Sequence, residues 1–554
     1  MFSIKRSSII TLGLLVLGLI SCYDLEEINI NPNGVDPANA HPNLLMSTVV
    51  TNAAQRAVSL GYGDIAGVMQ HTQKDGFSSS HNSYAWDDDN WSAYYAILRN
   101  NDELYNKAVE LNLEFHQGMA LVMKSYVFGL ITDLWGDAPY TSSLKGELGG
   151  EENIKPVFDP QSDIYTGILA DLETANTLLS KSQDSYSDIS PIQDALYAGD
   201  VTKWRKFANS LALRYYMRLS AKTPSVAQQG IEKITGDPSN YPLITTPGDD
   251  ASIAYPGNSA ADAWPNNVVF DGSGGSSFRR LMMCSTLIEK LQSLSDPRIG
   301  IWAQPIDIQI IVDESRSDGF DEIIDGVRFV AKNVEDQYIS TLGFPINSDP
   351  NYVGLPPAWS NVPQAYNLNP NLEQAPDNPH ASHLNDRYKS ASGPLLKARM
   401  LSASEIHFIL AEAALMGWNT GSSAGEHYNE GIRSSFTTWG VDGAYSSYIN
   451  NEGVQFDGSI EQIIEQKWIA SWTAAGEAWF DYRRTGLPNL QAGVFVNRDI
   501  LPIRLYYSLD EIDFNPINAG AAISKLESTD FTAPDGNNSA WSKMWLLQGT
   551  GKPW

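Results

Sequence analysis

The chain of 554 residues is long enough to bury a large hydrophobic core, and its formal net charge is −28. A surface this acidic repels nucleic acid and anionic lipid headgroups, so neither is an expected ligand. Only two cysteines are present, and no stretch after the first 20 residues approaches the length of apolar sequence that spans a membrane.

The chain begins with the parts of a bacterial lipoprotein signal peptide. Two basic residues precede an apolar run, Ile9 to Ile20, which is shorter than the roughly 20 residues of a spanning helix. Ser21 and Cys22 follow, and this pair resembles the site where such signals are cut and the cysteine is acylated. We therefore predict a signal peptide at 1–21 and lipidation of Cys22. An uncleaved helix and an ordinary secreted protein are the alternatives.

The segment after the signal is polar. Residues 22–42 contain turn formers such as Asn31-Pro32-Asn33-Gly34 and predict a lipidated tether, after which residues 43–554 form the body of the protein. If Cys22 is acylated, Cys284 is alone, so no disulfide is expected and core packing must hold the body together.

Apolar residues at three- and four-residue spacing predict helices on both sides of a loop-rich middle. We expect a helical scaffold at about 43–220 and 400–486, and a loop-rich subdomain at about 236–394, where Gly, Pro, Asn, Asp and Ser are frequent. The expected helices are 44–52, 91–113, 115–134, 163–179, 201–219, 281–294, 402–416, 425–439, 460–474 and 476–484, and the expected strands are 306–312 and 327–331.

The late helices come in pairs joined by short turns. This arrangement is typical of tetratricopeptide-like packing, although the strict consensus of that repeat is missing, so the spacing alone leaves the assignment open. Ser402 is expected to cap its helix, with Glu405 at the capping-box position.

Short segments spread over nearly the whole mature chain share one pattern. They are 133–140, 198–200, 203–204, 207–211, 213–214, 409–414, 466–468 and 477–486, with Arg504, Tyr507, Glu511, Asn515 and Asn518 in the closing loop. Together they resemble the SusD/RagB family, in particular its SusD-like branch of nutrient-binding outer-membrane lipoproteins of Bacteroidetes. Each segment is weak alone, but together they follow the order of the family. Ser508 departs from the pattern, because a proline usually follows the tyrosine there, and the tail lacks the usual paired tryptophans.

The resemblance implies a mostly α fold, with tetratricopeptide-like helix pairs as a scaffold and a variable, loop-rich side that binds glycan. It also implies a lipid-anchored protein on the cell surface, above a TonB-dependent, SusC-like outer-membrane transporter that receives the captured oligosaccharide. The resemblance further implies that the protein catalyses no reaction. The acidic residues after Cys22 resemble a surface-export tract, although a solvated tether fits equally well. A peptide or another nutrient is the alternative ligand, and a surface glycosidase is the alternative class of protein.

A glycan site needs aromatic faces for the apolar faces of sugars, and amide, carboxylate or guanidinium groups for the hydroxyls. The segment 84–91, expected as a loop before a helix, offers Trp86 for stacking, Asp87 and Asn90 for hydrogen bonds, and Trp91 beside them. Alternatively, both tryptophans belong to the core, and Asp89 or Asn90 caps the helix. A second set of candidates lies in the loop-rich middle: Trp264, Asn266, Arg279, Trp302, Tyr352 and Trp359.

No cofactor and no metal site are expected. The segments 87–89 and 535–538 are rich in side-chain oxygens that Ca²⁺ accepts, but neither has the spacing of a calcium loop. The segment 421–425 matches the nucleophile-elbow pattern, yet it joins two predicted helices, whereas the elbow follows a strand. Arg214, Asp481 and Arg483 lie on predicted helices and are expected to form internal ion pairs.

Overall fold

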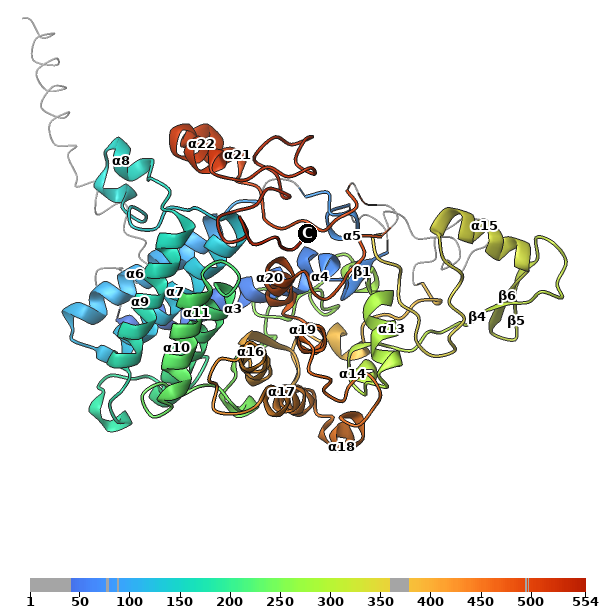
Figure 1. The fold of residues 1–554 in the computed structure, drawn as a ribbon, viewed down its shortest axis with the longest axis horizontal. Helices are drawn as coiled ribbons and strands as arrows, with labels where there is room; N and C mark the ends of the chain where they lie inside the picture. The colour runs from blue at the N-terminus through green and yellow to red at the C-terminus, as the bar shows by residue number, and fades with distance from the viewer. Residues whose placement is uncertain (1–40, 76–78, 87–88, 359–377, 494–495, 497) are drawn as a thin grey trace, which may run out of the picture.

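The structure is a computed structural model that describes residues 41–75, 79–86, 89–358, 378–493, 496 and 498–554. Helices dominate it, as the sequence predicts, and the strands are short. One group of helices, which includes α6, α7, α9, α10 and α11, forms one end of the molecule, and α16, α17, α19 and α20 lie in the middle (Figure 1). The helix α15 and the strands β4, β5 and β6 form the opposite end (Figure 1).

The first group is built around α7, which is buried along nearly its whole length because its sequence is apolar on all sides. It packs against α6 and α9, and it ends at Gly136, whose φ of 98° is one that L side chains rarely adopt. Asp200 caps α10 by accepting a hydrogen bond from the backbone N–H of Lys203 at 3.0 Å. The helices of this group are α3 (Pro42–Tyr62), α6 (Ser92–Glu110), α7 (Glu114–Trp135), α9 (Gln161–Leu178), α10 (Val201–Arg218) and α11 (Pro224–Gly236).

The second group contains the predicted late helices. Ser402 caps the first of them by accepting from the N–H of Glu405, so this prediction is confirmed. Ser423 and Glu426 form a complete capping box at the next helix, which makes 421–423 a turn between helices. The bounds are α16 (Ala403–Leu415), α17 (Ala424–Trp439), α19 (Ile460–Ala470) and α20 (Ala475–Thr485), and α16 packs against both α17 and α19.

The strands form three small sheets. In the first, β1 (Thr72–Lys74) pairs antiparallel with β3 (Leu281–Met283), with Gln73 opposite Met282. In the second, β2 (Ala251–Ala254) pairs antiparallel with β7 (Lys397–Leu401). In the third, β6 (Val327–Val330) lies between β4 (Ile310–Val312), which is parallel to it, and β5 (Asp321–Ile324), which is antiparallel.

Several elements differ from the sequence-based expectation. The expected helix 281–294 begins only at Ser285, because residues 281–283 form strand β3. The helices α11 and α15 were not expected, although Pro224 stands at the start of α11, where proline favours a helix. The shorter helices are α4 (Asp64–Val68), α5 (Ser79–Ser83), α8 (Glu151–Ile154), α12 (Ser276–Arg279), α13 (Ser285–Ser293), α14 (Ile299–Trp302), α15 (Lys332–Leu342), α18 (Tyr445–Tyr448), α21 (Leu509–Phe514) and α22 (Pro516–Ser524).

The core consists of one large apolar cluster shared by the helical groups and a smaller one at the end that carries β4 and β6. Between α7, α10, α16, α19 and α20 the interior also holds buried ion pairs. Arg214 pairs with Glu405 at 2.7 Å, and Asp481 pairs with Lys467 at 2.7 Å. Arg483 donates to the carbonyl of Ile503 at 2.9 Å. The prediction that these motif residues serve the scaffold is confirmed. No helix of the described ranges combines the length and the apolar character that a membrane span requires.

Candidate functional site

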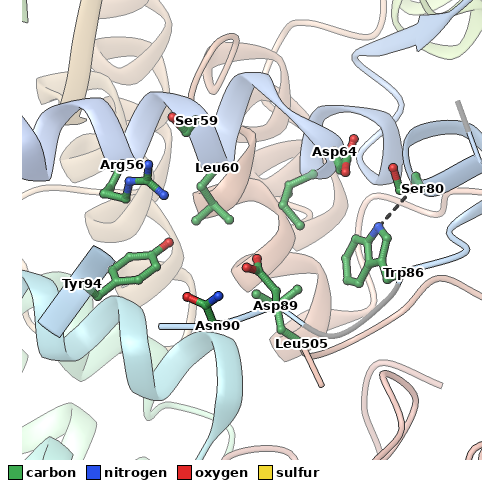
Figure 2. A pocket seen from close by; sticks show the side chains of 11 residues that line it. Arg56, Ser59, Leu60, Asp64, Ser80, Trp86, Asp89, Asn90, Tyr94 and Leu505 are labelled. Atoms are coloured by element: carbon green, nitrogen blue, oxygen red, sulfur yellow. Dashed lines mark hydrogen bonds between the residues drawn. The ribbon is translucent and has the colours of Figure 1, made fainter. Parts of the chain in front are cut away.

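An open pocket of about 330 Å³ lies where the C-terminal half of α3 faces the segment before α6 (Figure 2). Its volume is within the range of small-molecule sites, roughly 300 to 1,000 Å³. Leu60 lies along one wall, and Trp86 stands at one end (Figure 2). The lining residues are Arg56, Ser59, Leu60, Asp64, Ile65, Ser80, Trp86, Asp89, Asn90, Tyr94 and Leu505.

The position of Trp86 is fixed from two sides. Its indole N–H donates to the carbonyl of Ser80 at 3.0 Å (Figure 2). Its ring meets Trp479 edge-on at a centroid distance of 5.6 Å. The helix that carries Ser80 approaches closely because Gly67 has no side chain. A Cβ there would lie 2.2 Å from the carbonyl oxygen of His81. Trp86 is half-buried, so it combines a fixed ring with an exposed part.

Polar groups gather at the other end of the pocket. Arg56, Tyr94, Asn90 and Asp89 direct their side chains toward the same space (Figure 2). Arg56 is exposed and has no hydrogen-bond or ion-pair partner within the described part of the chain. Burial raises the pKa of Tyr94, so its hydroxyl is neutral at physiological pH and can both donate and accept.

Asp64 supplies a permanent negative charge beside Trp86. Burial alone would raise the pKa of its carboxyl, but the contact with His81 and the charge of Lys74 outweigh burial and lower the pKa to about 2. Lys74 Nζ lies 3.6 Å and His81 Nδ1 lies 3.4 Å from Asp64 Oδ1. His81 is fully buried, and burial lowers the pKa of its imidazole, so the ring is neutral at pH 7 and contacts the carboxylate as a neutral imidazole.

The side chains that line this pocket are suited to bind a ligand. It joins an aromatic ring and apolar side chains to a guanidinium, an amide, a phenol and carboxylates, which together recognise a ring with hydroxyl groups. A glycosidase needs a carboxylic acid with a raised pKa as its proton donor. Asp64 has the opposite property, since its pKa is about 2 and it remains ionised.

Trp86 and Asn90 of the predicted site line the same pocket. The prediction that Trp91 contacts the ligand is wrong. Trp91 is 5% exposed, and its ring meets Trp135 and Tyr507 edge-on at 5.6 and 5.9 Å. Its indole N–H donates to Glu511 at 2.9 Å. Both its faces and its polar atom serve the core, so it offers no surface to a sugar. Asn90 also accepts from the N–H of Ser92 at 3.1 Å, at the start of α6.

The prediction is also wrong for Trp264 and Trp302 in the middle region, because both are fully buried. Trp264 packs against Tyr62 and Tyr255 at 5.1 and 5.3 Å. Trp302 stacks on Trp472 at 5.5 Å with an interplanar angle of 19°. A ring whose faces are covered by protein cannot stack on a ligand, so composition alone misled the prediction: the surrounding loops are polar, but they enclose aromatic core.

The remaining candidates do not line the pocket of Trp86. Asn266 is half-buried in a turn with φ 60°, and Tyr352 is half-buried against the core. Arg279 lines a separate hollow of about 430 Å³ that also contains Asp386 and Lys389. Cys22, Asp87 and Trp359 lie outside the described residues.

Arg56, Asp64 and Tyr94 line the pocket but were not predicted from the sequence as site residues. One signal was available: Arg56 is the single charged residue in α3, whose remaining sequence is apolar or uncharged. A lone charge on such a helix indicates a position that faces solvent or a site. Tyr94 was assigned to a helix, but its hydroxyl end was not connected with the preceding loop, because the register between α3 and α6 cannot be derived from either segment alone.

The oxygen-rich segment 535–538 is occupied by internal contacts. The carboxylate of Asp535 accepts from Arg498 at 2.6 Å and from Tyr506 at 2.8 Å. Asn538 accepts from the N–H of Tyr507 at 3.0 Å. Over the described ranges, no group of three or more His, Cys, Asp or Glu side chains is placed to hold a metal ion.

The fold and the pocket together define a helical binding protein with an open, mixed polar and aromatic site. A family model described as "Starch-binding associating with outer membrane" matches residues 34–343 and 345–508. The chain therefore belongs to the SusD-like family, whose members are binding proteins rather than enzymes and are associated with the outer membrane.

Solved structures with the same fold agree with this assignment. A SusD homologue from Bacteroides fragilis is 22% identical, with a TM-score of 0.66 over 92% of this chain and 99% of that chain. A chitin-binding SusD homologue from Flavobacterium johnsoniae is 21% identical, with a TM-score of 0.66 over 91% of this chain and 99% of that one. A SusD-like protein from Bacteroides thetaiotaomicron is 20% identical, with a TM-score of 0.65 over 91% and 98%. No curated protein matches the sequence.

Proposed function

We propose that this protein captures oligosaccharides at the cell surface and delivers them to a TonB-dependent outer-membrane transporter of the SusC-like type. The observation that carries the proposal is the pocket in which the half-buried ring of Trp86 faces the unpaired guanidinium of Arg56 across Leu60 (Figure 2). Stacking on the ring and hydrogen bonds to hydroxyls supply the affinity, and neither requires a cofactor.

The charges of the pocket favour a neutral glycan over an acidic one. Arg56 is accompanied by two carboxylates, Asp64 and Asp89, so the lining is acidic on balance. The whole chain carries a net charge of −28, which adds a long-range repulsion for polyanions. A neutral polysaccharide such as starch or chitin meets neither penalty, and both are named among the family and its relatives.

The lipid anchor follows from the sequence. Acylation of Cys22 would hold the protein at the outer membrane, since two or more acyl chains give stable anchoring. The tether 22–42 would then leave the body free to cover a transporter. Replacement of Cys22 by alanine is expected to release the protein from the membrane fraction of cells, and retention of the variant there would contradict the anchor.

The test of the binding site is affinity electrophoresis of the mature chain in gels that contain soluble starch, glycol chitin or pectin. We expect retardation by a neutral polysaccharide and none by pectin. Trp86→Ala should weaken the retardation at least about tenfold, which corresponds to roughly 1.4 kcal/mol of binding free energy. Trp418→Ala is the matched control, because Trp418 is also half-buried but lies outside the pocket.

Three outcomes would change the proposal. Equal retardation of Trp86→Ala and the wild type would move the site elsewhere on the molecule. Retardation by no polysaccharide would favour the alternative ligand, a peptide or another nutrient. Release of shorter sugars during incubation with the polysaccharide would show that the protein is a glycosidase, and would overturn its assignment as a binding protein.

A further inference from the structure

A second hollow lies on the scaffold itself. It has a volume of about 470 Å³ and is enclosed by α6, α7, the loop after α7 and one residue of α9, which lie at the same end of the molecule (Figure 1). None of its lining residues is shared with the pocket of Trp86. Neither the sequence motifs nor the binding function proposed above account for it.

The loop that closes this hollow is held in place by several contacts. The backbone N–H groups of Tyr140 and Thr141 both donate to Asp159 at 2.9 Å, and the Thr141 hydroxyl donates to the same carboxylate at 2.7 Å. The Tyr140 ring meets Phe128 edge-on at 4.7 Å, and its hydroxyl donates to Asp171 at 3.2 Å. The hollow is therefore preformed, so a ligand would not have to order the loop.

The charged residues of the lining balance one another. Lys124 pairs with Asp171 at 2.9 Å, and Lys145 and Asp102 add one further charge of each sign. Because the sum is zero, an ionic ligand gains no net attraction, whereas a neutral ligand with many hydroxyls finds both donors and acceptors. Asn106, which donates to Asp102 at 3.1 Å, adds an amide to this set.

Two polar groups of the lining have no partner within the described part of the chain. The half-buried Tyr105 makes no hydrogen bond through its hydroxyl. Asn101 is 3% exposed and donates to the carbonyl of Ala120 at 2.9 Å, but its Oδ1 accepts no hydrogen bond. An unpaired buried acceptor destabilises a fold, so the wall of the hollow retains hydrogen-bonding capacity that the protein does not use.

We propose that this hollow is a second binding site for a short neutral saccharide, with Tyr105 as the stacking ring. The alternating donors and acceptors suit sugar hydroxyls, and a purely apolar ligand would leave Lys124, Asp102 and Asn106 without new partners. This proposal depends on the function proposed above in one respect only, namely that the ligand is a saccharide. Two separate sites on one chain would hold a polymer by avidity.

The test counts bound ligands by isothermal titration calorimetry with maltotriose and with chitotriose, which are too short to bridge two distant sites. The proteins are the mature wild type, Trp86→Ala, Tyr105→Ala, the double variant, and Val109→Ala, which removes an exposed side chain from α6 outside the hollow. We expect two equivalents of one trisaccharide on the wild type and on Val109→Ala, one on each single variant, and none on the double variant. Tyr105→Phe should bind with intermediate affinity, because it keeps the ring and loses the hydroxyl, and circular dichroism verifies that each variant is folded.

The two proposals fail in different ways. One equivalent on the wild type, lost in Trp86→Ala and unchanged in Tyr105→Ala, overturns the second site and supports the first. One equivalent that disappears in Tyr105→Ala and persists in Trp86→Ala supports the second site and overturns the first. Absence of binding of both trisaccharides to the wild type overturns the saccharide assignment of this hollow.

Discussion

The interior between the helices and the pocket of Trp86 use charge in opposite ways. In the interior, Arg484 is paired on two sides, with Glu412 and with Asp481, the latter at 2.9 Å. In the pocket, Arg56 has no partner within the described residues. A guanidinium that stabilises the scaffold is paired with internal carboxylates. A guanidinium that binds a ligand must be free of such partners. The presence or absence of an internal carboxylate partner thus distinguishes a structural arginine such as Arg484 from a candidate binding arginine such as Arg56.

The interior pairs form a connected network. Arg218 lies 2.6 Å from Glu477, which also lies 3.3 Å from Arg214. Burial would raise the pKa of Glu477, but the charges of Arg214 and Arg218 outweigh it and lower the pKa. The network therefore joins α10 to α20, which are far apart in the sequence. The ion pairs of Arg214 with Glu405 and of Arg484 with Glu412 also connect both helices to α16.

The largest effect is expected from breaking this network. Arg484→Met leaves Glu412, which is fully buried, without its cation. Removal of one partner of a buried ion pair typically destabilises a protein by about 3–5 kcal/mol, because the remaining charge is uncompensated. Urea unfolding of the mature chain, followed by circular dichroism, measures this loss in the free energy of unfolding.

The matched control is Arg433→Met. Arg433 pairs with Glu430 at 3.1 Å on the surface, where both side chains are about half exposed. Exposed pairs contribute only about 0–1 kcal/mol. If Arg484→Met were as stable as Arg433→Met, the network would not hold the helices together.

The scaffold could be predicted from the sequence because its signals are local. The three- and four-residue spacing located α7 and α10, and Ser402 indicated the start of α16. Motif residues such as Arg214 were assigned to ion pairs, and the structure confirms this. Their partners could not be named, because Glu405 lies 191 residues from Arg214 in the chain.

The binding site could be predicted only in part for the same reason. The loop with Trp86 and Asn90 carries local signals, but the opposite wall comes from α3, and only the packing of helices brings Arg56 to it. Burial was the other obstacle. Trp264 and Trp302 lie among Gly, Pro and Asn residues as exposed aromatics do, yet tertiary contacts enclose them completely.

Removal of the open charge in the pocket should affect binding and leave stability almost unchanged. A hydrogen bond to a charged group contributes about 1.5–3 kcal/mol, so Arg56→Ala should weaken glycan binding by roughly 10- to 100-fold. Surface substitutions without a partner usually change stability by less than about 0.5 kcal/mol. Titration calorimetry and thermal unfolding of the same samples separate the two quantities.

Arg99→Ala is the control for this substitution, because Arg99 is also exposed and unpaired among the described residues but lies outside the pocket. It should bind as the wild type does. Equal binding by Arg56→Ala and Arg99→Ala would show that the open guanidinium does not contact the ligand.

A pH-dependent effect is expected from Asp250, a half-buried carboxylate that forms no ion pair within the described part of the chain. It accepts a hydrogen bond from the N–H of Ala403 at 2.7 Å, but burial dominates and raises the pKa to about 7. In the unfolded chain the pKa of an aspartate is about 3.9. Between these two values the folded state keeps a proton that the unfolded state has released, so stability falls as the pH rises from about 4 to about 7 and is constant above.

Asp250→Asn removes this titration and keeps an oxygen for the N–H of Ala403. The thermal midpoint of the variant should therefore rise relative to the wild type as the pH increases from 4 to 7, with no further change at pH 8. The exposed Asp530→Asn serves as the control and should follow the wild type throughout. A constant difference between Asp250→Asn and the wild type over this pH range would show that folding does not raise the pKa of Asp250, and that the charges of Arg399 and Lys397 offset its burial.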